Sequence, residues 1–469
     1  MSAALHALAL TVAVLVFLFI RAQGEQLVGA PAPGLPAPTS GAPTSDTLLH
    51  VLLALAVIIA TARITGAALR RLGQPPVIGE ILGGILLGPS LFGRIAPDLF
   101  ATTFPSSSAP FLYVIAQIGV ILYMFLVGLD VDLGIVRRRG HTMLAISHAS
   151  IVVPFILGAG LALALYPHVA SNGVSFTTFA LFLGVSLSVT AFPVLARILH
   201  DQGVAKSPMG NLALGCAAIS DVAAWCLLAL AVSAAQDRSD RAILTVMLTL
   251  TYVVVMLTVG RPLLARLVGV LEQRGARLTD GGMAVLCVAA LLSAVMTEVI
   301  GIHAIFGAFL LGAIVPRNSP VVGEISGRTE AIVRVLLLPT FFAYTGLRTQ
   351  IGLLSTASDW LLCLLIIALA TLGKWGASTV AARLTGLPWR DASALGILMN
   401  TRGLVELIVL NIGLDLGLIS PTLFAMLVLM ALVTTIMTPP IFQAITRMHP
   451  WREEGVNLRV GKLAAPNEI

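Results

Sequence analysis

The chain consists largely of apolar segments, each about long enough to cross the roughly 30 Å hydrocarbon core of a bilayer as a helix. Hydrophobic residues make up 58% of the sequence and charged residues only 11%, which excludes an ordinary soluble domain. About fourteen such segments can be counted, at residues 5–21, 46–69, 76–93, 109–130, 142–166, 174–199, 209–235, 241–261, 279–300, 302–316, 330–350, 357–383, 391–414 and 421–446. The sequence therefore predicts an all-α polytopic membrane protein with about 13 to 14 transmembrane helices.

The first segment is set apart from the others by a stretch rich in Ala, Pro and Gly. We therefore predict that residues 1–45 form an N-terminal helix and a flexible linker. The segment lacks the basic n-region of a signal peptide, and we favour a retained helix, with a signal anchor and a cleaved signal open as alternatives. Residues 46–446 are assigned to the transmembrane domain and residues 447–469 to a short tail.

Basic residues alternate along the loops between the segments. They concentrate after the even-numbered segments, for example at Arg70, Arg197 and Arg383, and again in the C-terminal tail. Because positively charged loops stay in the cytoplasm, this pattern predicts a multi-pass protein of the cell (plasma or inner) membrane with a cytoplasmic C-terminus. The excess of 28 Lys+Arg over 22 Asp+Glu follows from this topology and does not indicate nucleic-acid binding.

Two short motifs recur within the transmembrane domain. The sequence GGILLG at residues 83–88 resembles GAFLLG at 307–312, and GLDVDLG at 128–134 resembles GLRTQIG at 346–352. Both pairs are offset by seven segments, and because seven is odd, the second unit crosses the membrane in the opposite sense. We therefore predict inverted repeats at about residues 46–235 and 279–446, an architecture typical of secondary transporters.

One acidic residue, Asp221, lies near the middle of the apolar segment 209–235. A charge at that depth costs about 2.5–3.5 kcal/mol on insertion scales, so such residues usually face a cavity, a partner or an ion path. A structural aspartate satisfied by neighbouring helices is the alternative. We predict that Asp221 binds a cation or a proton, with a further oxygen from Ser220, and that the only metal it holds is a transported ion.

Segments 174–199 and 391–414 correspond to each other under the repeat, and both contain residues that interrupt a helix. In the first, Pro193 removes a backbone donor near Thr190, although an ordinary proline kink is the alternative. The second carries polar residues and a glycine at its middle, namely Thr401, Arg402, Gly403 and Glu406. Unwound backbone at this depth survives only where it is buried or lines a cavity. We therefore expect both interruptions to lie beside the site.

The other charged residues within the segments receive less specific predictions. Arg402 and Glu406 are four residues apart, so we expect them to pair and to balance the broken helix rather than to bind the ion. Lys374 has no partner nearby in the sequence, and its role stays open. Arg63 and Glu80 are expected to snorkel or to cap helix ends.

Four motifs together resemble one known family: SVTAFPVLARIL, ISDVAAWCLLALA, FFAYTGLRTQI and MNTRGLVELIVLNIG. They resemble the monovalent cation:proton antiporter superfamily, and most of all its bacterial Na+ or K+/H+ branch and the plant cation/H+ exchangers. The resemblance covers about residues 46–446. It implies a sodium/proton-antiporter-type fold, in which a core of six helices with two crossed broken helices rocks against a panel that forms a homodimer interface.

The resemblance also implies roles for individual residues. Asp221 matches the aspartate that binds cation and proton, and Thr190 matches the polar residue at the first helix break. Arg348 matches a basic residue that either pairs with the binding aspartate or stabilises the core. The family commonly carries Asn-Asp or Asp-Asp where this chain has Ser220-Asp221, and from the single carboxylate we infer electroneutral exchange of one cation for one proton.

The sequence thus predicts a secondary active transporter in the lipid bilayer that exchanges Na+ or K+ for H+ by alternating access, with the two ions competing at Asp221. We expect no enzymatic activity and no cofactor, because no convergent set of nucleophile, base and metal ligands is found. An ion-coupled carrier of an organic solute on the same fold, or a cation channel, stays open as an alternative.

Overall fold

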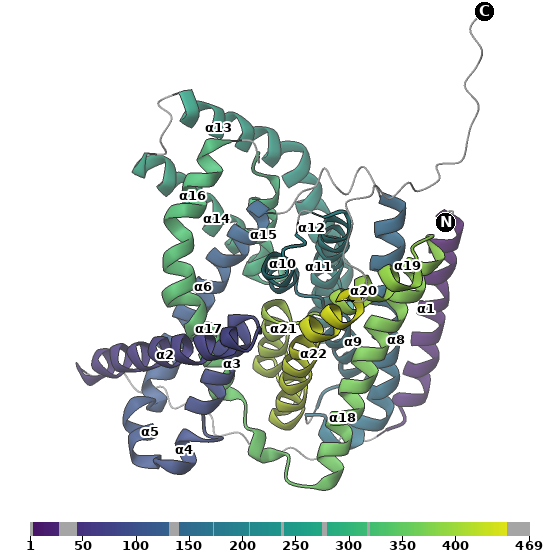
Figure 1. Cartoon of the computed structure of the whole chain (residues 1–469), viewed down its shortest axis with the longest axis horizontal. Helices are drawn as coiled ribbons and strands as arrows, with labels where there is room; N and C mark the ends of the chain where they lie inside the picture. Colours follow the sequence, from purple (N-terminus) through teal and green to yellow (C-terminus); the bar gives the residue numbers. More distant parts are fainter. Residues whose placement is uncertain are drawn as a thin grey trace, which may run out of the picture.

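The computed structural model describes residues 3–27, 45–130, 140–171, 173–205, 207–235, 239–273, 279–316 and 319–447, and these residues are predominantly helical (Figure 1). The helices of the first half are α1 (Ala3–Gly24), α2 (Ser45–Arg71), α3 (Pro76–Leu87), α4 (Phe92–Ile95), α5 (Pro97–Thr103), α6 (Ala109–Asp130), α8 (Gly140–Val169), α9 (Phe176–Ser188), α10 (Phe192–Asp201) and α11 (Pro208–Ala235). Those of the second half are α12 (Ser239–Val255), α13 (Arg261–Gln273), α14 (Asp280–Ile300), α15 (Ala304–Ile314), α16 (Pro320–Ile332), α17 (Leu338–Arg348), α18 (Ala357–Thr371), α19 (Ala377–Leu384), α20 (Trp389–Met399), α21 (Leu404–Asp415) and α22 (Pro421–Arg447).

Helix lengths agree with a polytopic membrane protein. The described residues hold 11 helices long and apolar enough to cross a membrane, or up to 12 if the bent pair α20–α21 counts as one span. Two further apolar helices are shorter, at Ala9–Gly24 and Ala304–Ile314. The number predicted from the sequence is reached only when these two are included. At about 1.5 Å per residue, α15 is roughly 16 Å long and crosses about half of a bilayer core.

The helices form two groups, which lie on opposite sides in Figure 1. The panel group comprises α2, α3, α6, α14, α15, α16 and α17, and the core group comprises α8, α9, α10, α11, α18, α19, α20, α21 and α22. Helix α1 packs against α8 and α9, and a hydrogen bond of 3.1 Å from Thr177 Oγ1 to Glu25 Oε1 fixes its C-terminal end to the start of α9. The two groups match the panel and the core expected from the resemblance.

Contacts within the panel group are reciprocal between the two halves of the chain. Helix α3 packs on α17, and its repeat counterpart α15 packs on α6. Both contacts need glycine, because a Cβ added to Gly84 would lie 2.6 Å from Ala343 Cα and one added to Gly312 would lie 2.2 Å from the carbonyl oxygen of Phe125. This exchange of partners is the contact pattern that an inverted repeat produces. The boundaries of the repeats stay a prediction.

Two interrupted helices cross at the centre of the core group. The first is interrupted between α9 and α10, and the second between α20 and α21, which bend by 41° at their break. The Ala191 N–H of the first break donates to the Thr401 carbonyl of the second at 3.0 Å. Gly403 has a φ of 155°, and a Cβ at this position would approach Val194 Cγ2 to 2.6 Å. The predicted pair of crossed broken helices is therefore confirmed, and Gly403 allows the breaks to meet.

Some sequence-based predictions fall on residues that the structure does not describe. They concern the linker at residues 28–44, residues 131–134 of the repeated motif and the tail at 448–469. The choice between a retained α1 and a cleaved signal likewise stays a prediction.

Candidate functional site

Asp221 and Ser220 lie near the middle of α11 and are completely buried. Neither oxygen of the Asp221 carboxylate forms a hydrogen bond with the described part of the chain, and the same holds for Ser220 Oγ. Buried polar groups in folded proteins are almost always paired, and an unpaired carboxylate is the most costly exception. These three oxygens are therefore available to bind an ion or a proton.

Two groups act electrostatically on the Asp221 carboxylate without completing a hydrogen bond to it. One is the backbone N–H of Phe192, the first residue of α10, and the other is the ammonium group of Lys374. The N-terminus of a helix carries a partial positive charge, so the start of α10 favours a negative charge beside it. The break between α9 and α10 thus directs a helix end towards Asp221.

Lys374 is completely buried and connects three parts of the core group. Its Nζ donates to Thr190 Oγ1 at the first break and, at 3.3 Å, to Ser150 Oγ on α8. It lies on a π-helical turn, Leu372–Gly376, between α18 and α19. Such turns occur frequently at functional sites. The structure thereby gives Lys374, whose role the sequence left open, a place beside Asp221 and Thr190.

Arg402 joins the two helix breaks. Its guanidinium donates to the Ser186 carbonyl at 2.8 Å and to the Leu187 carbonyl at 2.6 Å, at the C-terminal end of α9. The last carbonyls of a helix have no partner within the helix and carry a partial negative charge, which a buried cation offsets. Arg402 also pairs with Glu406 at 2.6 Å, as the spacing of four residues predicts. The contact with α9 was not predicted.

The second break contains two further polar residues. Thr401 Oγ1 donates to the Leu398 carbonyl at 2.7 Å, which closes the end of α20. Asn400 is completely buried, and neither atom of its amide group has a hydrogen-bond partner among the described residues. Sequence reasoning did not propose Asn400 as a site residue. Its position, a polar side chain directly before a helix break at membrane depth, is the signal that could have identified it.

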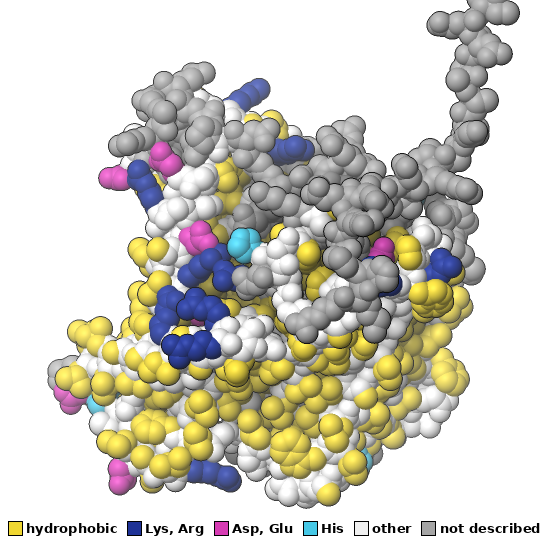
Figure 2. Space-filling model, viewed as in Figure 1, with side chains coloured by type: hydrophobic (Ala, Val, Ile, Leu, Met, Phe, Trp, Pro, Cys, Tyr) yellow, Lys and Arg dark blue, Asp and Glu magenta, His cyan; other side chains and the backbone are white. Residues whose placement is uncertain are grey.

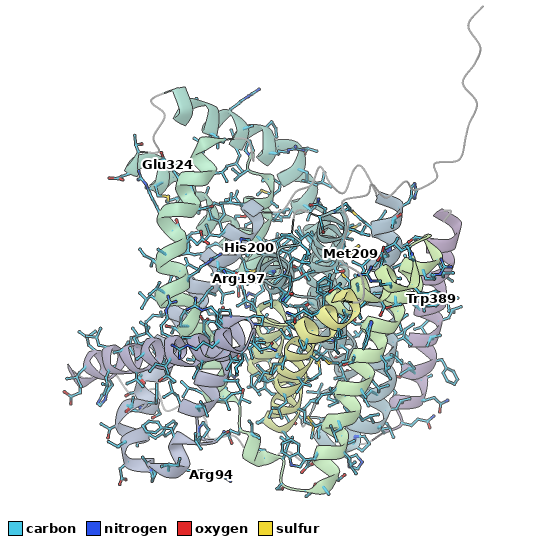
Figure 3. The ribbon with its side chains drawn as sticks, in the orientation of Figure 1. Arg94, Arg197, His200, Met209, Glu324 and Trp389 are labelled. Atoms are coloured by element: carbon cyan, nitrogen blue, oxygen red, sulfur yellow. The ribbon has the colours of Figure 1, made fainter. Side chains whose placement is uncertain are left out.

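Two adjoining cavities open beside the first break. They have volumes of about 310 and 440 Å³ and share Tyr123, Pro193, Arg197 and Arg334 as lining residues. Together they reach Phe192 at the start of α10 and Leu404 at the start of α21. We call this the arginine-rich side of the molecule. Figure 3 shows Arg197 and His200 on α10 at this position. The cavities therefore reach the two helix starts that flank the site from the arginine-rich side.

On the opposite side, a polar contact joins the two groups. Arg348 Nη2 at the end of α17 forms an ion pair with Asp415 Oδ1 at the end of α21, at 2.7 Å. Arg348 Nη1 also donates to Asn411 Oδ1 at 3.1 Å, and the guanidinium lies over the Tyr344 ring. Arg334 lies on the π-helical turn Val333–Leu337 that precedes α17, and Arg348 is the last residue of α17, about 21 Å further along the same continuous helix. Of the two roles that the resemblance implies for Arg348, an ion pair with Asp221 is not formed in this structure.

Comparison with known proteins places the chain in a family. The profile described as "Sodium/hydrogen exchanger, transmembrane" matches residues 55–447, which is most of the chain. The chain belongs to this family. The Na(+)/H(+) antiporter NhaS4 of Synechocystis is 45% identical to this chain over 408 residues. These residues cover 87% of this chain and 98% of that relative.

More distant relatives are longer than this exchanger. Cation/H(+) antiporter 18 of Arabidopsis thaliana is 39% identical over 84% of this chain, and K(+)/H(+) antiporter 1 of Saccharomyces cerevisiae is 37% identical over 79%. The matches cover only 48% and 43% of those relatives. Among solved structures, the sodium proton antiporter MjNhaP1 of Methanocaldococcus jannaschii superposes with a TM-score of 0.53 at 14% sequence identity, over 86% of this chain and 97% of that one. The exchanger thus shares the fold of that antiporter.

The ion pair between Arg348 and Asp415 allows a specific prediction. Replacing Asp415 with asparagine removes a partly exposed ion pair, worth about 0.5–1 kcal/mol, that holds α21 against α17. The equilibrium between closed and open forms of this side should shift by about two- to fivefold. We expect hydrogen–deuterium exchange at the ends of α17 and α21 to become faster by that factor. Asp98→Asn, at an exposed acid of α5, is the matched control, and equal exchange in both variants would contradict the role of Asp415.

Proposed function

We propose that this protein moves Na+ or K+ across the membrane in exchange for H+, by alternating access, and that both ions compete for Asp221. The observation that carries this proposal is a completely buried carboxylate, with both oxygens unpaired, beside the crossing of two broken helices. Relatives that match most of the chain are named for Na(+)/H(+) and K(+)/H(+) exchange. That naming supports a monovalent cation as the second ion.

The mechanism follows from the chemistry of one site with two competing occupants. Hard oxygen ligands suit a dehydrated alkali cation. We propose that the Asp221 carboxylate and Ser220 Oγ provide them, and that Thr190 and the backbone carbonyls left without a donor by Pro193 provide further oxygens nearby. A bound proton or cation neutralises the carboxylate, whereas the empty charged site resists movement through the low-dielectric interior. The core group can then rock against the panel only when the site is occupied.

The surroundings of the exchanger are also part of the proposal. The arginine-rich side would face the cytoplasm of a plasma or inner membrane, with the C-terminus on the same side, because arginine-rich loops are retained there. Large apolar side chains on α14, such as Leu292, Val295 and Val299, are exposed on the panel group. Such a surface is suited to lipid and to the panel of a second copy in a homodimer.

Transport by the purified exchanger in proteoliposomes tests this proposal. With a pH-sensitive dye inside, adding Na+ or K+ outside should drive saturable proton movement without any organic solute. Comparing the rate with Li+, a smaller cation, tests how the size of the ion affects transport. Proton movement that requires an organic solute, or single-channel currents, would contradict cation–proton exchange. The same assay with an imposed voltage tests the charge stoichiometry. Exchange of one cation for one proton should not respond to voltage, whereas release of a second proton from Lys374 would make it respond.

A further inference from the structure

The cavity on the arginine-rich side has an unusual lining for the entrance of a cation path. The smaller chamber, of about 310 Å³, is lined by Arg63, Arg70, Arg197 and Arg334 but by a single acid, Glu80. The adjoining chamber adds Glu330 and His200. Figure 2 shows a patch of Lys and Arg side chains on this face, with hydrophobic surface below it and to its left. The cavity therefore concentrates positive charge where a cation must pass.

The described lining of the cavity holds more arginines than acids. Arg334 Nη2 pairs with Glu330 Oε1 at 2.5 Å, and the Glu80 carboxylate interacts electrostatically with both Arg63 and Arg334. Two carboxylates thus face four guanidiniums in the described lining. Like charges that converge in a cleft with low-dielectric walls raise the local potential and attract counter-ions. An anion is the ligand that this arrangement favours.

Retention of positive charge at the cytoplasmic membrane surface accounts for part of the cluster only. Arg70 lies at the end of α2, where retention of positive charge beside the membrane accounts for it. Arg63 lies seven residues earlier in α2, about 10.5 Å back along the helix and inside the span, where a cation is costly. Arg63 lines the cavity together with Arg334 from the panel group and Arg197 from α10 of the core group. The guanidiniums thus converge from three separate helical segments.

We propose that this cavity binds a phosphate-bearing anion, with the guanidiniums of Arg63, Arg197 and Arg334 as its ligands. The planar fork of a guanidinium matches two phosphate oxygens, which makes phosphate a better partner than chloride or a single carboxylate. The rest of the lining includes apolar groups such as Val77, Leu338 and Phe342. This mixture suits a phosphate that carries an organic group, either the head group of an anionic phospholipid or a soluble phosphate ester.

The bound anion would regulate transport, and this part of the inference rests on the proposed exchange activity. Arg197 belongs to the core group, whereas Arg63 and Arg334 belong to the panel side of the cavity. An anion held by all three bridges the groups and binds only while this side is open. A ligand that binds one of two conformations increases the population of that conformation. The anion therefore holds the exchanger open to the arginine-rich side and slows the cycle.

The soluble arm of the test uses pyrophosphate and the full chain in detergent at low ionic strength, because salt screens such contacts. We expect pyrophosphate to raise the temperature of thermal unfolding with a saturable dose response. Arg63→Gln/Arg334→Gln should weaken the apparent affinity at least tenfold, and Glu80→Gln should strengthen it, because that variant removes an opposing charge. Arg266→Gln, an exposed arginine of α13, is the matched control and should behave like the unmodified chain.

The lipid arm uses nanodiscs of phosphatidylcholine alone or mixed with phosphatidylglycerol. If a lipid head group fills the cavity, phosphatidylglycerol should weaken pyrophosphate binding to the unmodified chain and to Arg266→Gln. Unchanged binding in these discs would assign the cavity to a soluble phosphate ester. In proteoliposomes, pyrophosphate on the arginine-rich side should slow cation-driven proton movement at least severalfold, and it should not slow the double variant.

Three results would overturn the anion site. The first is an unfolding temperature that pyrophosphate does not change in detergent, together with no effect of phosphatidylglycerol. The second is an equal apparent affinity for pyrophosphate in the double variant and in Arg266→Gln, and the third is a lower affinity in Glu80→Gln than in the unmodified chain. The two proposals fail separately. Saturable pyrophosphate binding without cation-driven proton movement would refute exchange and leave the anion site in place, whereas normal exchange without anion binding would refute the site alone.

Discussion

Replacing Asp221 with asparagine is expected to abolish cation-driven proton movement, with a fall in rate of at least about 100-fold. The asparagine side chain has nearly the same shape, but it can neither take up a proton nor neutralise a cation. Asp221 is completely buried and both oxygens of its carboxylate are unpaired, so the substitution removes the proposed ion-binding group itself. The rate is measured as dequenching of a pH-sensitive dye in everted vesicles on addition of Na+ or K+.

Measuring thermal stability distinguishes the loss of transport in Asp221→Asn from misfolding. A buried carboxylate without hydrogen bonds destabilises the fold, so Asp221→Asn should unfold at the same temperature as the unmodified chain or at a higher one. Asp98→Asn, at an exposed acid of α5, should transport at the normal rate. Exchange at the normal rate in Asp221→Asn would exclude Asp221 as the shared site.

Replacing Arg402 with methionine is expected to give the largest loss of stability, about 3–5 kcal/mol. The substitution leaves the completely buried Glu406 carboxylate without its cation and the carbonyls of Ser186 and Leu187 without their donors. Thermal unfolding in detergent measures the effect. We expect transport to fall as well, because Arg402 joins the two helix breaks that flank the site.

A second substitution identifies the cause. In Arg402→Met/Glu406→Leu no unpaired carboxylate remains, so part of the stability should return. The return should be incomplete because the end of α9 still lacks its donors. The matched control is Arg21→Met, which breaks an exposed pair with the same spacing, Arg21 and Glu25, and should cost less than about 1 kcal/mol. Equal losses in Arg402→Met and Arg21→Met would contradict the buried role of Arg402.

The features that could be predicted from sequence are those with a local cause. Apolar segments of bilayer length define helices, because backbone groups in lipid must be satisfied within the segment. Pro193 and Gly403 mark the two breaks, since one lacks a backbone donor and the other adopts a positive φ. The pair of Arg402 and Glu406 follows from a separation of four residues on one helix.

The rest of the site depends on contacts between residues far apart in the chain. Lys374 and Thr190 are separated by 184 positions, and Arg402 lies 216 positions from Ser186. Spacing in the sequence carries no information about such pairs unless the packing of helices is known. Arg348 shows the same limit, because its partner Asp415 is contributed by another helix 67 positions further along.

The attachment of α1 to the core group has a mechanical consequence. Helix α1 packs against α8 and α9 of the core group, whereas the next helix, α2, belongs to the panel group. With α1 retained, the chain between Leu27 and Ser45 is a covalent tether between the two groups that the proposed alternating access moves. Fully extended, it reaches at most about 60 Å. The length of this tether sets an upper limit on how far the two groups can separate.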